Sequence, residues 1–68
     1  MSSVATALPG EIARVEEIAS QYEAIPPASQ IALHAIIRPA LERARAALRS
    51  GDAVAMVRAY ADLQEITE

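Results

Sequence analysis

The stretch IALHAIIRPALERARAALR, residues 31–49, decides the fold of this chain. Five of its apolar residues recur at spacings of four, four, three and four, which places them on one face of an α-helix. These residues are Leu33, Ile37, Leu41, Ala44 and Leu48. Alanine, the strongest helix former, fills many of the other positions. The pattern predicts a helix over about 28–49, and Pro39 inside it predicts a kink or a break.

Helix-ending signals lie on both sides of this stretch. Gly51 suits the left-handed position after a helix, and Asp52 suits the N-cap of the next one. A third helix is therefore expected at about 52–66, and so short a connection favours an antiparallel hairpin with the second helix. Upstream, Ile25-Pro26-Pro27 should end a first helix near residue 24, because residues before proline avoid helical geometry.

Pro9 suits the first turn of a helix, where its missing N–H costs nothing. We therefore expect the first helix at about 9–24, residues 1–7 as a flexible N-terminal arm, and residues 8–68 as a single helical domain. The predicted fold class is all-α, with three helices at about 9–24, 28–49 and 52–66.

The second helix is more apolar than a single bundle requires. A second arc, made of Ala32, Ala35, Ile36, Pro39 and Ala46, widens its apolar face to roughly 240°, where a surface helix needs little more than about 100°. A chain of 68 residues without cysteine has a marginal core, so a partner copy is the expected aid. We predict a homo-oligomer, with an alanine-rich monomer surface as the alternative. The interface candidates are Leu33, Ile36, Ile37, Ala40, Leu41 and Ala44.

One polar strip stands out on the second helix. His34, Arg38, Glu42, Arg45 and Arg49 share one side of it, and this helix carries about +3 between two helices of about −3. We call these five residues the arginine strip. Two interpretations stay open: a ladder of intrahelical ion pairs in solvent, or a surface that binds an anion or a partner through two-point guanidinium contacts.

Tyr22 and Tyr60 are the only aromatic residues. Each lies on or near an apolar stripe, which favours core packing, whereas an exposed tyrosine would anchor a partner or stack on a base. The ligand- or partner-binding candidates are therefore His34, Arg38, Arg45, Arg49, Tyr60 and Tyr22.

Several function classes have no support in the sequence. With no cysteine and one histidine, neither a metal site nor a cofactor is expected, and no catalytic motif or Gly-rich phosphate loop occurs. The N-terminus does not resemble a signal peptide, and no apolar run approaches the length of a membrane span. The net charge of −3 argues against nucleic-acid binding. A non-enzymatic cytoplasmic protein is the expectation.

Three segments together resemble a known group of proteins: LPGEIARV at 8–15, IPPA at 25–28 and SGDAVAMVRAY at 50–60. In that order they are similar to small helical accessory proteins of Mu-like transposable phages and prophages of Gram-negative bacteria. The family offers no catalytic residues to carry over. The resemblance implies a protein that binds a host protein or blunts a host defence inside a bacterial cell.

Three functions follow as hypotheses. The first is a non-catalytic phage accessory protein that homo-oligomerises and binds a host target, inhibiting a defence or regulatory system. The second is an oligomeric sponge that binds an anionic cyclic nucleotide signal at a subunit interface. The third is a small DNA-binding regulator. It is less favoured, because the last helix is acidic where a recognition helix needs basic and amide side chains.

Overall fold

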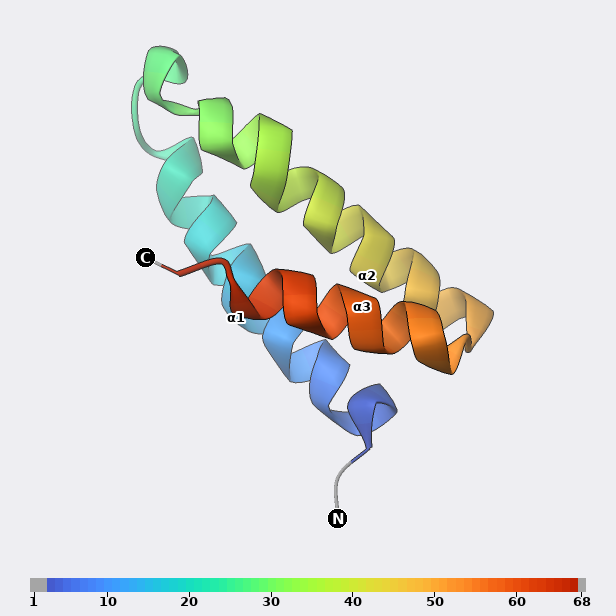
Figure 1. Cartoon of the computed structure of the whole chain (residues 1–68). Helices are drawn as coiled ribbons and strands as arrows, with labels where there is room; N and C mark the ends of the chain where they lie inside the picture. The colour runs from blue at the N-terminus through green and yellow to red at the C-terminus, as the bar shows by residue number, and fades with distance from the viewer. Residues whose placement is uncertain (1–2, 68) are drawn as a thin grey trace.

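Three α-helices enclose one apolar interior in the computed structural model, which describes residues 3–67 (Figure 1). They are α1 (Val4–Glu23), α2 (Arg38–Ser50) and α3 (Ala53–Gln64), with a 3-10 turn η1 (Pro27–Ser29) and a π-helical turn η2 (Leu33–Ile37) ahead of α2. No strand occurs within residues 3–67, which confirms the all-α prediction. The molecule measures 40 × 19 × 17 Å.

Helix α1 begins at Val4, one turn and more before the predicted start. Residues 4–7 are therefore helical, and the prediction of a flexible arm is wrong there; residues 1 and 2 lie outside the described part. Pro9 lies inside the helix instead of in its first turn. Burial explains the extra turn, because it places Leu8 in the core and packs Val4 against it. The helix ends at Glu23, as Ile25-Pro26-Pro27 predicts.

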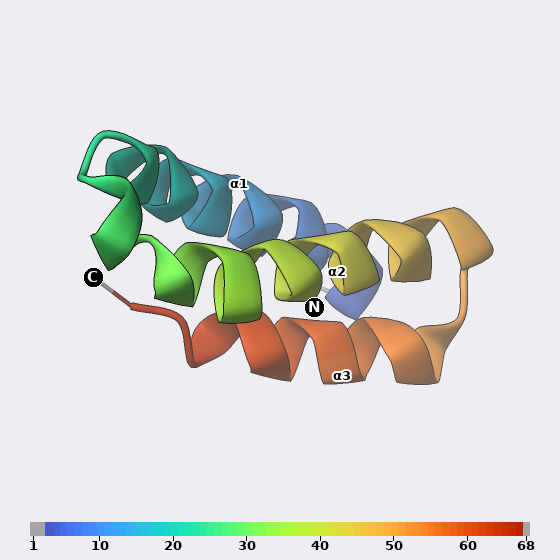
Figure 2. The same cartoon turned by 90° about the horizontal axis from the view of Figure 1, so that it is seen from above.

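The connection from α1 to α2 is closed by Gln30. Its side-chain amide donates hydrogen bonds to the carbonyls of Glu23, at 3.3 Å, and Ile25, at 2.8 Å. The first bond satisfies a carbonyl that the end of α1 leaves without a helical partner, and the second satisfies one in the connection itself. The connection lies at one end of the molecule, and the α2–α3 turn lies at the other (Figure 2).

Pro39 neither breaks the helical stretch nor leaves it regular. The stretch runs from residue 31 to residue 50, and η2 precedes Pro39 within it. At the end of η2 the Arg38 N–H bonds to the Leu33 carbonyl, five residues back. A proline ring crowds the carbonyl four residues before it, here Ala35, and the wider π turn accommodates that crowding without ending the helix.

The turn between α2 and α3 has the predicted chemistry. Gly51 adopts the left-handed conformation, with φ at 70°, and its N–H bonds to the Ala47 carbonyl. Asp52 caps α3 by accepting hydrogen bonds from the N–H groups of Val54 and Ala55, at 3.0 and 3.2 Å. Both features were predicted, and α3 then runs over residues 53–64 beside α2 (Figure 2).

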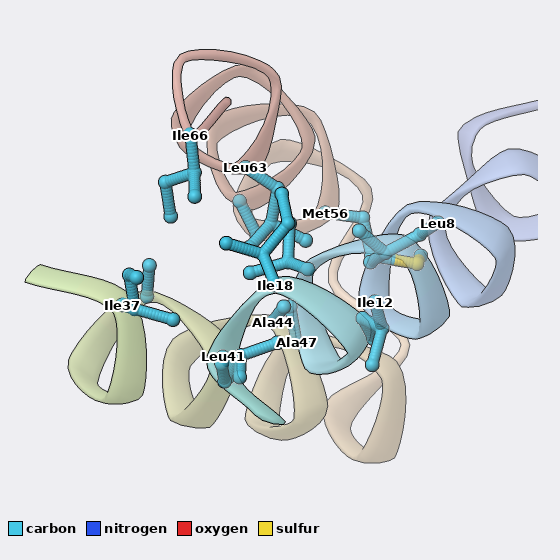
Figure 3. Packing of buried hydrophobic residues seen from close by; sticks show 14 of the residues in the cluster. Leu8, Ile12, Ile18, Ile37, Leu41, Ala44, Ala47, Met56, Leu63 and Ile66 are labelled. Atoms are coloured by element: carbon cyan, nitrogen blue, oxygen red, sulfur yellow. The ribbon is translucent and has the colours of Figure 1, made fainter. Parts of the chain in front are cut away.

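Side chains from all three helices meet in one core. Figure 3 shows Ile12 and Ile18 of α1, Leu41 of α2 and Leu63 of α3 turned toward a shared interior. No polar or charged residue within 3–67, Ser29 aside, is buried there. Five of the six interface candidates, Leu33, Ile37, Ala40, Leu41 and Ala44, also lie in this core, at most 4% exposed. The chain buries these five side chains in its own core, so they are not available to a partner, whereas Ile36 remains exposed.

Two neighbouring residues test this assignment. Leu33 is 0% exposed and Ile31 is 73% exposed. We expect Leu33→Ala to lower the free energy of unfolding by about 2–5 kcal/mol, because it leaves a cavity in the core. Ile31→Ala should change it by no more than about 0.5 kcal/mol. Urea titrations at one protein concentration measure both, and equal effects of the two substitutions would contradict the packing described.

Candidate functional site

Two residues of the arginine strip point to α1. Arg38 forms an ion pair with Glu23 at 3.3 Å, and Arg45 forms one with Glu16 at 2.6 Å. The four side chains line a groove of about 330 Å³ between α1 and α2. We call it the α1–α2 groove; it is lined by Glu16, Ala19, Glu23, Arg38, Leu41, Glu42 and Arg45.

These pairs change the interpretation of the strip. Of the two interpretations, the ladder within α2 through Glu42 is wrong, because the ion-pair partners of Arg38 and Arg45 lie on α1. The groove also holds three glutamates against two arginines, so an anion would meet net negative charge there. All four paired side chains are 43–56% exposed, and each pair contributes at most about 1 kcal/mol. Their geometry indicates that they align α1 on α2.

The rest of the strip faces solvent. His34 lies exposed in η2, and Arg49 lies exposed near the end of α2. Arg49 lines a shallow hollow of about 520 Å³ on α2, together with Glu42, Arg43, Arg45 and Ala46. Of the three arginines in this lining, Arg43 and Arg45 are ion-paired with Asp62 and Glu16, so Arg49 supplies the unpaired positive charge. Within residues 3–67 Arg49 has no ion-pair partner, so this is the part of the strip that could meet an anion.

Both tyrosines are half-buried and pack against the core, Tyr22 from α1 and Tyr60 from α3. Neither lines the α1–α2 groove or the hollow on α2. The structure therefore does not bring them together with the arginines as a base-stacking site would require.

A second groove separates α2 from α3 on their outer side. Its turn end, about 460 Å³, is lined by four alanines, Ala46 and Ala55 among them, and by four polar or charged residues. Its open end, about 450 Å³, is lined by residues that include Ile36. Arg43 and Asp62, 3.7 Å apart, line both ends and so mark its middle. We call this the α2–α3 groove. The second apolar arc of the sequence reaches the surface here.

Arg14 performs a role that the sequence analysis missed. Its guanidinium donates hydrogen bonds to the carbonyls of Leu63, at 2.8 Å, and Ile66, at 2.9 Å. It also donates to both carboxylate oxygens of Glu11, at 3.0 and 3.1 Å. Arg14 thus fastens the carboxyl end of α3 to α1. Its one signal in the sequence is that it is the single arginine of an otherwise acidic first helix.

The Glu11 carboxylate, which accepts both hydrogen bonds, raises the pKa of Arg14 above its usual value, and desolvation opposes this without reversing it. A raised pKa means that the contribution of Arg14 to stability is lost only when the pH rises through that pKa. Arg14 therefore stays charged, and its contacts stay in place, at every pH at which a protein is ordinarily handled.

Replacing Arg14 tests this contact. Arg14→Met keeps an apolar stem but removes the hydrogen bonds to α3, and we expect it to lower the free energy of unfolding by about 1–2 kcal/mol. Amide exchange at residues 63–66 should accelerate more than exchange in α2, because the carboxyl end of α3 is released. Arg49→Met, which removes an exposed arginine, is the matched control. Equal exchange in the two variants would refute the role of Arg14.

Two further properties limit the kinds of site present. His, Asp and Glu side chains within residues 3–67 form no group of three or more that could hold a metal ion. Over the same residues, none of the helices combines the length and the apolar character needed to cross a bilayer.

Comparison with protein-family models, with curated proteins and with solved structures finds no match for this chain. The resemblance to proteins of Mu-like phages consequently stays a prediction from the three quoted segments. The residues and surfaces described above are what any function must be built from.

Proposed function

We propose that this chain is a non-catalytic helical binding protein that self-associates and binds a protein target through α3. The observation that carries the proposal is the number of large aliphatic side chains left in solvent on so small a molecule. Val54 and Val57 of α3 are 60% and 57% exposed, and Ile36 is 58% exposed. Apolar surface of this kind is typical of protein-binding sites.

The exposed valines form a stripe on α3. Val54, Val57 and Ala61 follow one another at helical spacings, so they share one face, and all three are exposed. We call this the outer stripe of α3. It lies apart from the buried face of the helix, which carries Met56, Ala59 and Leu63. A helix that buries one face within its own chain and exposes a second apolar face to solvent suits insertion into the hydrophobic groove of another protein.

The charges support a protein target over an anionic ligand. Arg38 and Arg45, the centre of the arginine strip, are paired with glutamates of α1. Binding a phosphate there would require both pairs to be broken. An apolar surface needs no such rearrangement. The antiparallel α2–α3 hairpin is part of this proposal, and the Arg43–Asp62 ion pair between the two helices supports it.

The identity of the target class rests on the sequence resemblance. Within the proposal, the target is a host protein of a bacterial defence or regulatory system, and binding inhibits it in the cytoplasm. The outer stripe supplies the contact, because hot spots in protein interfaces are well-packed apolar anchors.

A charge placed in the outer stripe tests the proposal. A tagged chain expressed in a Gram-negative host should recover one host protein in near-stoichiometric amount. The double variant Val54→Lys with Val57→Lys should lose it, because two buried ammonium groups would have no partners in an apolar interface. Ala13→Lys with Ser20→Lys, on exposed positions of α1, adds the same charge elsewhere and should retain the target. Recovery that survives the valine substitutions, or no recovered protein at all, would contradict the proposal.

The positive hollow on α2 favours a second candidate, the nucleotide sponge. Arg43, Arg45 and Arg49 line it against a single glutamate. If it binds an anionic signal, cyclic dinucleotides should raise the melting temperature of the protein, and Arg45→Ala with Arg49→Ala should abolish the rise. High salt should weaken the effect. A panel of cyclic nucleotides that leaves the melting temperature unchanged would dismiss this candidate.

A further inference from the structure

We propose that the α2–α3 groove is the interface through which two copies of this chain form a symmetric dimer. The inference rests on the self-association in the proposed function and assigns it to a surface. In this dimer the two-fold axis crosses the groove at Arg43 and Asp62, so the turn end of one copy faces the open end of the other. The sequence predicted the interface on the apolar face of α2 that the core buries. The structure instead leaves the second apolar arc exposed and able to form it.

The charges at the two ends of the groove complement their own two-fold copy. Arg58 lines the turn end, Glu65 lines the open end, and the Arg43–Asp62 pair lies between them. Within residues 3–67 neither Arg58 nor Glu65 has an ion-pair partner. A two-fold axis through the middle brings Arg58 of each copy to Glu65 of the other. Two unpaired charges in one chain thus become two ion pairs in the dimer, the self-complementarity that an isologous interface needs.

The shape of the groove shows the same complementarity. Ile36, a large exposed side chain, lines the open end. Small side chains, Ala46, Ser50 and Ala55 among them, line the turn end. In the proposed arrangement α2 faces α2, so Ile36 of one copy enters the shallow turn end of its partner. Large side chains seated among small ones are how closely packed helices interlock.

A dimer of ordinary size would cover a modest share of the molecule. A stable interface covers about 800 Å² on each partner. The described molecule exposes 4439 Å², so the dimer would cover less than a fifth of its surface. The groove extends along both α2 and α3, while the outer stripe of α3 lies beside it and stays free for a target. The α1–α2 groove offers no comparable pairing, because Arg38 and Arg45 are already paired with glutamates of the same chain, whereas Arg58 and Glu65 are not, within the described part of the chain.

Charge reversal at the two ends of the groove tests the pairing. Light scattering on the native chain at micromolar concentration should return twice the monomer mass of 7.2 kDa. Arg58→Glu and Glu65→Arg should each raise the dissociation constant at least tenfold, because each places like charges opposite one another twice in a dimer. The double variant, Arg58→Glu with Glu65→Arg, should return the constant to near its native value.

Glu17→Arg, an exposed charge reversal on α1, is the control and should leave the mass unchanged. Far-UV circular dichroism of each variant separates loss of the dimer from loss of the fold. A native dimer that both single variants preserve would overturn the groove assignment and leave self-association standing. A folded native monomer of 7.2 kDa would overturn both, whereas loss of the host target alone would bear only on the outer stripe.

Discussion

The structure depends on the burial of one face of the helical stretch 31–50 against side chains of α1 and α3. This face contributes Leu33, Leu41 and Ala44 to the core. A chain of this size has a small core, and α2 supplies its centre. Packing a helix so rich in alanine lets its neighbours approach closely. The helix nevertheless carries more apolar surface than two neighbours cover, and the remainder, with Ile36 at one end, emerges in the α2–α3 groove.

Charge acts second, as an aligning force. The basic helix lies between two acidic ones, and ion pairs link it to each: Arg38 and Arg45 to α1, Arg43 to α3. Each pair is exposed and weak, but opposite charges at fixed positions favour one register of the helices over others. Arg14 adds a stronger contact, because its guanidinium joins α1 to the carboxyl end of α3 through two hydrogen bonds, while two more to Glu11 hold it in place on α1.

Local signals in the sequence predicted the elements, and tertiary contacts decided what differed. Gly51 and Asp52 fixed the α2–α3 turn, because backbone geometry there depends on the residues themselves. The start of the first helix was predicted wrongly from Pro9, because burial of Leu8 outweighs the local cost of a proline inside a helix. At Pro39 the expected irregularity is present as the π-helical turn before it. The helical spacing of apolar residues identified two apolar arcs on α2 correctly. It could not show which arc the chain would cover, since that depends on where α1 and α3 lie.

The candidate sites likewise depended on tertiary contacts that local signals in the sequence do not show. The strip was recognisable as a charge pattern, but its glutamate partners on α1 are distant in sequence, so the pairing was not predictable.

The proposed dimer depends on the contact between Arg58 of one copy and Glu65 of the other across the α2–α3 groove. The chain has no cysteine, so an equimolar mixture of the Arg58→Cys and Glu65→Cys variants tests it directly under mild oxidation. The account predicts a disulfide-linked pair of unlike chains and little linkage of either variant alone; no linkage in the mixture, or equal linkage in each variant by itself, would contradict it.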